Sequence, residues 1–376
     1  MTKTRVVILG AGFGGLEAAT TLSEALGDAI EITLIDFGAH FVFGFAKLDV
    51  MLGRVEPHSV RNTYDRIRLP GVRFINTRVT AIDPSERRVS TDDGEFIADY
   101  LIIALGAELD FAATPGLLEH GNEFYSVEGV ERLSEVIPSF AGGNVVIGVS
   151  GFPFKCPPAP SEAALMLDSH LRNLDLRSRT SIKVVLPLPV PIPPSPEASQ
   201  QILRRFADRD IEFLPGRRVH ALSPGVAALD DGSSLPFDLY LGVPVHKAPD
   251  VVQEAGFSPD GWIPVDSRTM ATSFPNVYAV GDCAAVGTPK AGVFAERQAK
   301  AVALNILAEL RGEQPSVQYD GWGTCYIEFG EEGVARVDVH FLDGTPTGEL
   351  QEPTPELTAE KANFGTSRVA RWFGPR

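Results

Sequence analysis

A glycine-rich loop near the start of the chain constrains the fold more than any other feature. Residues 10–15 read GAGFGG and come directly after the apolar run 6–9. Residues 16–26 then have the spacing of a helix with small side chains, and the apolar run 30–35 predicts a second buried strand. A strand, tight turn, helix and strand in this order form a βαβ unit with a parallel sheet. The chain is therefore expected to begin with an α/β domain.

Three glycines of this loop have the spacing of a dinucleotide site. Gly10 lets the chain turn, Gly12 lets the backbone approach a pyrophosphate, and Gly15 lets helix and strand pack closely. The N-terminus of the following helix attracts the phosphates. Asp36 ends the second strand, where a carboxylate can accept hydrogen bonds from both hydroxyls of an adenosine ribose. The loop alone does not distinguish NAD from FAD.

Composition sets limits on the class of protein. A chain of 376 residues with 44% hydrophobic and 22% charged residues is typical of an enzyme with two or three packed domains. The net charge of −16 argues against a broad nucleic-acid surface, which needs clustered Lys and Arg. The three cysteines have neither CxxC nor Cys/His spacing, so no metal site is predicted. The first apolar run is too short for a secretory signal, so a cytoplasmic protein is expected.

Further apolar runs extend the α/β pattern. Strands are expected at 100–104, at 144–149 and from 182, with helices over 200–207 and 292–310. The runs 324–329 and 334–341, joined by 330–333, predict a hairpin.

A second motif favours FAD. The segment 272–282, TSFPNVYAVGD, resembles the motif with which two-dinucleotide-fold flavoproteins hold the ribityl chain of the flavin, and Asp282 matches its aspartate. Val79 and the ALG segment 104–106 match positions near the adenine in such proteins. The resemblance implies FAD held by the following residues: Gly10, Gly12, Phe13, Gly14, Gly15, Asp36, Val79, Ala104, Gly106, Gly281, Asp282, Lys290 and Gly292.

The place of a second nucleotide loop is taken by a different sequence. Many such flavoproteins carry another glycine motif after the central strand to bind NAD(P)H, whereas this chain reads SGFPFKCPPAPSEAALML after residue 149. Proline lacks the N–H donor that would bind a pyrophosphate, and bulky side chains block its approach. NAD(P)H is therefore not expected as the electron donor.

Three segments together resemble the sulfide:quinone oxidoreductase and flavocytochrome c sulfide dehydrogenase family over nearly the whole chain. They are CPPAPSEA at 156–163, PKAG at 289–292 and TCYIEFGEEG at 324–333. The resemblance implies a disulfide between Cys156 and Cys325 on one face of the flavin. Hydrosulfide would attack it, leaving a persulfide on Cys156 and a thiolate on Cys325 that reduces the flavin. The further upstream cysteine common in the quinone-linked branch is absent from this sequence.

Other residues have two interpretations each. Lys290, before the helix over 292–310, is either a cation that stabilises reduced flavin or a solvated lysine. Glu162 either moves protons or favours a helix N-terminus. Cys283 is expected to pack under the ribityl chain, and His246 is either near the cofactor or structural.

The electron acceptor is expected to be a quinone. An apolar slot for it is predicted either at the aromatic run 41–45 or at the tail 367–376, whose arginines and Trp372-Phe373 suit peripheral contact with the inner face of the cell membrane. An ordinary packed terminus is the alternative for that tail. Alternative functions are an NADH:quinone oxidoreductase of related fold, a sulfide dehydrogenase with a cytochrome acceptor, and a redox-sensing flavoprotein without turnover. The sequence leaves a homo-oligomer open.

The predicted architecture is α/β, with two Rossmann-like domains, a C-terminal β-hairpin and a helical tail. The FAD domain takes residues 1–110 and 246–315, and the second Rossmann-like domain takes 111–245 with a degenerate NAD site and Cys156. Residues 316–376 form a C-terminal region that carries Cys325.

Overall fold

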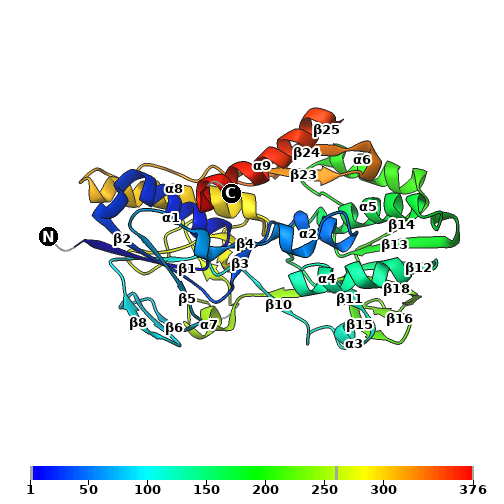
Figure 1. Ribbon diagram of the computed structural model, residues 1–376, viewed down its shortest axis with the longest axis horizontal. Helices are drawn as coiled ribbons and strands as arrows, with labels where there is room; N and C mark the ends of the chain where they lie inside the picture. Colours follow the sequence, from blue (N-terminus) through cyan, green and yellow to red (C-terminus); the bar gives the residue numbers. More distant parts are fainter. Residues whose placement is uncertain (1–2, 259–260, 375–376) are drawn as a thin grey trace.

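The first of two parallel sheets is built around the glycine-rich loop. The computed structural model describes residues 3–258 and 261–374 (Figure 1). Strand order in this sheet is β21-β9-β1-β2-β5, all parallel. The strands are β1 (Thr4–Leu9), β2 (Ile30–Asp36), β5 (Val72–Asn76), β9 (Tyr100–Ile103) and β21 (Val277–Ala279). Helices α1 (Phe13–Leu26) and α8 (Gly292–Leu310) pack on each other, and both faces of β1 are buried.

The second parallel sheet repeats this arrangement with order β11-β18-β12-β13-β14. Its strands are β11 (Asn122–Glu123), β12 (Gly143–Val149), β13 (Thr180–Leu186), β14 (Ile211–Pro215) and β18 (Leu239–Val243). Its helices are α4 (Val127–Val136), α5 (Ala159–Asn173) and α6 (Pro196–Asp208). The unit β12–loop–α5–β13 is thus the counterpart of β1–loop–α1–β2. Both sheets agree with the predicted two-domain α/β class.

Two connections between the sheets run side by side. β10 (Glu108–Asp110) leaves the first sheet for the second, β19 (Val245–Lys247) returns, and the two pair antiparallel. Antiparallel three-stranded sheets flank the main ones: β6 (Val79–Asp83), β7 (Arg88–Thr91) and β8 (Gly94–Ile97); β15 (Val219–Ser223), β16 (Val226–Leu229) and β17 (Ser234–Pro236). Short elements lie in the connections: β3 (His40–Phe41), β4 (Asn62–Thr63), β20 (Ile263–Pro264), β22 (Ala284–Ala285), α2 (Ala46–Met51), α3 (Leu117–His120) and α7 (Asp250–Glu254).

A C-terminal layer lies along the top of both units in Figure 1. It consists of β23 (Trp322–Glu328), β24 (Val334–His340), β25 (Thr347–Thr354) and α9 (Pro355–Phe373). The predicted hairpin and helical tail are present, and β25 adds a third strand that its polar sequence did not reveal. β23 contacts α5 and α8, and α9 reaches α1. This layer therefore lies against helices of both parallel sheets.

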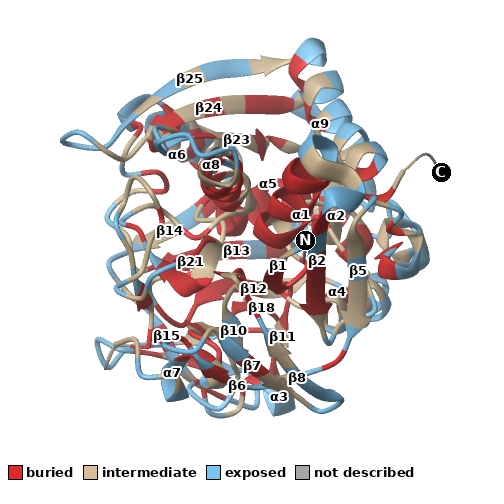
Figure 2. Cartoon of the chain, turned by 90° about the vertical axis from the view of Figure 1, so that its left-hand side faces the viewer, coloured by how far each residue is buried: buried red, intermediate tan, exposed pale blue. Residues whose placement is uncertain are grey.

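The end of the tail packs inside the protein. Trp372 is fully buried, Phe373 is 2% exposed, and the Trp372 ring lies against Phe13 and Phe41 (Figure 2 shows the burial along the chain). For Trp372 and Phe373 the structure therefore shows a packed terminus, which was the alternative to a membrane contact. Arg376 of the predicted tail lies outside the described residues. Within the described part of the chain, no helix is both long and apolar enough to cross a membrane.

Candidate active site

A cavity of about 330 Å³ lies where α1, α5, α8, β23 and α9 come together. Its wall contains most of the predicted site residues: Gly12, Phe13, Gly14, Ala104, Gly106, Cys156, Glu162, Gly281, Asp282, Gly292 and Cys325. The other predicted residues lie outside the wall: Gly10, Gly15, Asp36, Val79 and Lys290. The fold thus unites residues from both ends of the chain in one space.

The glycine loop leaves room where a phosphate is expected. Gly10 has φ +94° and passes so close to β9 that a Cβ would lie 2.3 Å from the Ala104 carbonyl oxygen. At Gly15 a Cβ would lie 1.8 Å from the carbonyl oxygen of Gly10. By contrast, a Cβ at Gly12 would meet nothing within 4 Å. Helix α1 begins there without a side-chain cap, so open space faces the N–H groups of its first turn.

The Asp36 side chain is hydrogen-bonded to the backbone of the glycine loop and to the backbone just after β2. Its carboxylate oxygens accept hydrogen bonds from the N–H groups of Ala11 and Gly38, each at 2.7 Å. Burial raises the pKa of Asp36, and these two hydrogen bonds lower it. Its contact with a ribose stays a prediction. Val79, also predicted near the adenine, begins β6 in a flanking sheet.

Asp282 follows a backbone turn that only glycine adopts easily. Gly281 has φ +74°, and its N–H donates to Gln298 Oε1 at 2.8 Å. Burial raises the pKa of Asp282, while the nearby ammonium groups of Lys155 and Lys290 lower it. The carboxylate lies in the cavity wall, next to the start of α8, which has no side-chain cap. Two helix N-termini, those of α1 and α8, therefore border the cavity.

The two predicted redox cysteines lie in this wall as free thiols. Cys156 occupies the loop between β12 and α5, at φ +52°, with its N–H donating to the Lys290 carbonyl oxygen at 2.8 Å. Cys325 lies on β23, opposite Val337 of β24. Burial raises the pKa of both thiols, that of Cys325 to about 12, and the Glu162 carboxylate raises both further. The ammonium groups of nearby lysines oppose this at Cys156.

Glu162 lies in the same cavity wall as the two cysteines and is hydrogen-bonded to the C-terminal layer. It is 3% exposed in the first turn of α5, and its Oε1 accepts a hydrogen bond from the Glu328 N–H at 3.1 Å. Burial raises its pKa to about 7, although Lys361 lowers it. The carboxyl can therefore hold or release a proton near neutral pH.

Three lysines in the wall were missed by the sequence prediction: Lys47, Lys155 and Lys361. The Lys47 ammonium donates to the Tyr125 carbonyl oxygen, and burial lowers its pKa to about 8. Lys155 Nζ donates to the Ala107 carbonyl oxygen at 3.3 Å, and Lys361 Nζ lies 2.6 Å from Glu328 Oε1. The position of Lys155 beside Cys156 was a usable signal. Lys47 and Lys361 gave none, because only the fold brings α2 and α9 to the cavity.

Lys290, the lysine that the sequence predicted for the site, does not line the cavity. Lys290 Nζ donates to the Asp282 carbonyl oxygen and lies 3.5 Å from the centroid of the Trp262 ring. Cys283 is fully buried, with its thiol 3.5 Å from the carbonyl oxygen of Ile103. His246 is buried with Nδ1 2.8 Å from the Pro244 carbonyl oxygen. These three residues are packed around the cavity without lining it.

One side of the cavity is aromatic. Phe41 and Phe45 of the predicted slot line it, together with Phe364 and Tyr326 from the C-terminal layer. Phe45 stacks on Phe43 at 5.3 Å between centroids. The site thus combines a glycine loop, two thiols, a carboxyl with a pKa near neutrality, ammonium groups and an apolar wall.

These features define a flavoprotein-type oxidoreductase, and comparisons with known proteins identify its family. Residues 4–299 match the family model "Pyridine nucleotide-disulphide oxidoreductase", so the chain belongs to that family.

Its relatives include quinone-linked enzymes. The chain is 27% identical to the mitochondrial sulfide:quinone oxidoreductase of Mus musculus over 354 residues, covering 89% of this chain and 78% of that protein. It is 28% identical to an NADH dehydrogenase-like protein of Mycobacterium tuberculosis, covering 75% of this chain and 73% of the relative. The crystal structure of the sulfide:quinone oxidoreductase from Aquifex aeolicus superposes with a TM-score of 0.87 at 22% identity, covering 99% of this chain and 93% of that one, which shows the shared fold. The predicted resemblance to the sulfide:quinone oxidoreductases is confirmed.

Proposed function

We propose that this chain binds FAD, oxidises hydrosulfide through Cys156 and Cys325, and passes the electrons to a quinone. The observation that carries the proposal is the convergence of both cysteines on the cavity that the glycine loop borders. The relatives named sulfide:quinone oxidoreductases support the same substrates.

The proposal that FAD binds here rests on how well the glycine loop and the residues around it fit a dinucleotide. The open space at Gly12 and the uncapped start of α1 suit a pyrophosphate, and Gly281 and Asp282 border the same space. The start of α8 offers a second positive helix end. FAD, when bound, would supply a two-electron acceptor that can be reoxidised by a quinone.

The sulfur chemistry belongs to the two cysteines. In their disulfide form, hydrosulfide attacks one sulfur, a new S–S bond forms, the old one breaks, and the second cysteine leaves as thiolate. Cys156 is the proposed persulfide carrier and Cys325 the proposed flavin-facing thiolate. Over one turnover hydrosulfide, quinone and one proton become zero-valent sulfur and quinol. The quinone gains the two electrons that the sulfur loses.

Charge in the cavity suits an anionic substrate. Lys47, Lys155 and Lys361 line it, and the first and last of these lower the pKa of Cys156. Positive charge favours both an entering hydrosulfide and the thiolate that forms. Glu162, with its pKa near 7, accepts the proton of the bound hydrosulfide or persulfide.

The aromatic side suits the acceptor. A quinone head is flat and apolar with two carbonyl oxygens, and Phe41, Phe45 and Phe364 form an apolar wall beside the Lys361 ammonium. Lys361 lies over the Phe45 ring at 5.1 Å from its centroid. A cytochrome acceptor and a redox sensor without turnover are the other candidates, and the apolar wall does not favour either of them.

NADH oxidation is the second candidate, favoured by the NADH dehydrogenase-like relative. The loop after β12 argues against it. Its Cys156 N–H already donates to the Lys290 carbonyl oxygen, and both Ser161 and Glu162 donate to the Pro158 carbonyl oxygen. These backbone donors are thus engaged within the protein, away from a second pyrophosphate.

One anaerobic experiment separates the candidates. The FAD-loaded protein is mixed with sulfide or with NADH, and the flavin absorbance is followed before a soluble quinone is added. We expect bleaching by sulfide alone and recovery on addition of quinone. Bleaching by NADH with no response to sulfide would overturn the proposal.

A further inference from the structure

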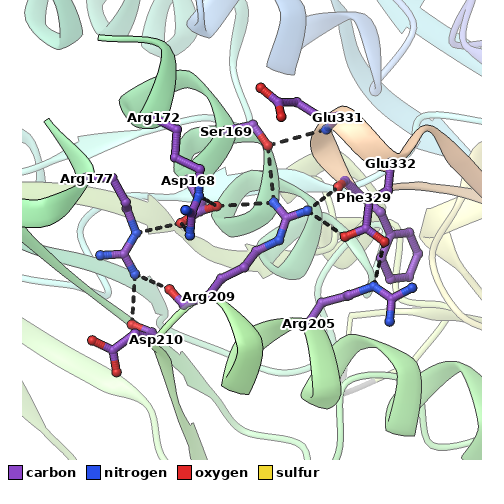
Figure 3. Close-up of polar contacts among 10 residues, drawn as sticks. All are labelled: Asp168, Ser169, Arg172, Arg177, Arg205, Arg209, Asp210, Phe329, Glu331 and Glu332. Atoms are coloured by element: carbon purple, nitrogen blue, oxygen red, sulfur yellow. Dashed lines mark hydrogen bonds and ion pairs between the residues drawn. The ribbon is translucent and has the colours of Figure 1, made fainter. Parts of the chain in front are cut away.

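An ion-pair network behind the cavity connects the two cysteine-bearing segments (Figure 3). Its centre is Asp168 of α5, which is fully buried. The Asp168 carboxylate accepts from Arg177 Nε at 2.5 Å, Arg172 Nε at 2.8 Å and Arg209 Nη1 at 3.2 Å. Three guanidinium groups balance the charge of this buried carboxylate. The loss of one of them still leaves Asp168 with two cationic partners.

Arg209 differs from the other arginines because it reaches both segments. It follows α6 and is 12% exposed. One end of its guanidinium donates to Asp168 and to Ser169 Oγ, each at 3.2 Å. The other end, Nη2, donates to the Phe329 carbonyl oxygen at 3.1 Å and to Glu332 Oε1 at 2.7 Å. Figure 3 shows this side chain lying between the two groups of acceptors.

The two segments are those that carry the redox chemistry. Helix α5 begins just after Cys156 and bears Glu162. Phe329 follows directly on β23, the strand of Cys325. The contact between them is close, since a Cβ at Gly330 would lie 2.1 Å from Ser169 Oγ and 3.0 Å from the Leu165 carbonyl oxygen.

The network and the active site share one face of α5. Residues 162, 165 and 169 have the spacing of one helix face. At the cavity end of this face Glu162 accepts a hydrogen bond from the Glu328 N–H, and about two turns further along Ser169 Oγ accepts one from the Glu331 N–H at 3.4 Å. The end of β23 is therefore fastened to α5 at two levels, and Arg209 secures the level farther from the cavity.

We propose that Arg209 is a positioning residue for the Cys156–Cys325 pair: its fork joins Asp168 and Ser169 of α5 to Phe329 and Glu332 after β23, and so holds the two sulfurs at the separation at which their disulfide forms. This inference rests on the proposed function, in which the two cysteines form a redox pair. A lysine at position 209 cannot replace the fork, because one ammonium cannot reach both sets of acceptors with the same geometry.

The test is the reduction potential of the cysteine pair in the FAD-loaded protein. The protein is equilibrated with glutathione buffers of set potential, where one oxidised glutathione takes two electrons and two protons from the thiols and becomes two reduced molecules. Free thiols are then alkylated and counted by mass. We expect Arg209→Gln to make the disulfide roughly tenfold less stable, which is about 30 mV for a two-electron couple. Arg209→Lys should give an intermediate shift.

Arg205→Gln is the matched control. Arg205 Nε donates to Oε2 of the same Glu332 at 2.7 Å, whereas Asp168 and Ser169 are bonded by Arg209, so loss of Arg205 should leave the reduction potential unchanged. Glu332→Gln weakens the hydrogen bond from Arg209 Nη2 to residue 332 without leaving a buried charge unpaired. It should shift the reduction potential in the same direction as Arg209→Gln, but by less.

Three results would overturn the inference. The first is an unchanged potential in a folded Arg209→Gln protein with normal FAD content. If that variant does not fold, an unchanged potential in Glu332→Gln decides against the inference. A wild-type protein that never forms the Cys156–Cys325 disulfide would instead refute the redox pair of the proposed function, and with it this inference.

Discussion

The two loops that follow β1 and β12 occupy equivalent places in their sheets and offer opposite chemistry. The first, residues 10–15, has open space at Gly12 in front of an uncapped helix. The second, residues 150–158, has bulky side chains and two adjacent prolines, and its Cys156 N–H is already bonded to Lys290. Ligands bind in parallel α/β sheets at the carboxyl ends of the strands. Here that position holds a glycine loop with open space in one unit and a thiol in the other.

The difference shows how one architecture separates binding from chemistry. A glycine loop presents backbone N–H groups and no side chains, so it suits a ligand that is held but not altered. The second loop carries a thiol instead, which burial keeps protonated and which the ammonium groups of Lys361 and Lys47 favour as a thiolate. The following predictions test this contrast, beginning with the largest expected effect.

Removing the nucleophile of the second loop should abolish sulfide oxidation. We expect Cys156→Ser and Cys325→Ser each to slow sulfide-driven flavin bleaching by at least ~10³-fold, because loss of a nucleophile has effects on this scale in other enzymes. The measurement is anaerobic stopped-flow absorbance. Cys283→Ser is the control, since the fully buried Cys283 does not line the cavity. A Cys156→Ser protein that bleached at the normal rate would remove the disulfide mechanism.

Glu162→Gln should slow the same step by roughly 100-fold, as expected for loss of a general base. Because burial raises the pKa of Glu162 to about 7, the wild-type rate should rise with pH through that value as the carboxylate forms. The ionisation of sulfide itself also raises the rate in both proteins, so the ratio of wild-type to variant rate should rise through pH 7. The pH profile of the bleaching rate checks both points, with the exposed Glu197→Gln as control. An unaltered profile in Glu162→Gln would contradict the proposed role.

The same substitution should stabilise the fold at high pH. Between the ordinary pKa of 4.5 and the folded value of about 7, the folded protein holds a proton that the unfolded chain has released. Stability contributed by this group is therefore present at low pH and lost as pH rises through that window, amounting to about 3 kcal/mol by pH 8. Urea unfolding at pH 5 and pH 8 should show Glu162→Gln gaining stability relative to wild type only at pH 8. An equal difference at both values would refute this.

Filling the first loop should weaken FAD binding and leave the fold intact. A valine at position 12 meets no neighbour at Cβ, so Gly12→Val should fold but occupy the space in front of α1. Loss of one or two charge-assisted hydrogen bonds, about 1.5–3 kcal/mol, predicts roughly 10- to 100-fold weaker binding. FAD titration of the apoprotein measures it. Gly151→Ala in the second loop is the control and should not alter FAD affinity.

The sequence predicted the backbone of the site better than its charges. Local patterns located the glycine loop, the strands β1, β2, β9, β12 and β13 and the helix over 292–310, because period and turn chemistry act over short stretches. The strands β5, β11, β14 and β18 of the two parallel sheets were not predicted. Lys47 and Lys361 could not be predicted, since α2 and α9 reach the cavity only through tertiary packing. Lys290 was chosen from its position before α8, and its ammonium contacts Trp262 and the Asp282 carbonyl oxygen, so its role toward the flavin stays a prediction. The strand β25 was missed because its exposed polar residues lack an apolar alternation.

The smallest expected effect concerns the charge beside the second loop. The first loop offers a ligand the backbone N–H groups of an uncapped helix, whereas the second loop has the ammonium of Lys47 close to Cys156. Lys47→Met should raise the sulfide concentration for half-maximal rate about fivefold at pH 7, or about 1 kcal/mol. Because burial lowers the pKa of Lys47 to about 8, wild type and variant should converge as pH rises past that value. Comparison at equal pH cancels the ionisation of sulfide itself, and Lys300→Met, which removes an exposed charge from α8, should behave as wild type. A fivefold difference that persisted at pH 9.5 would show that Lys47 acts through packing rather than charge.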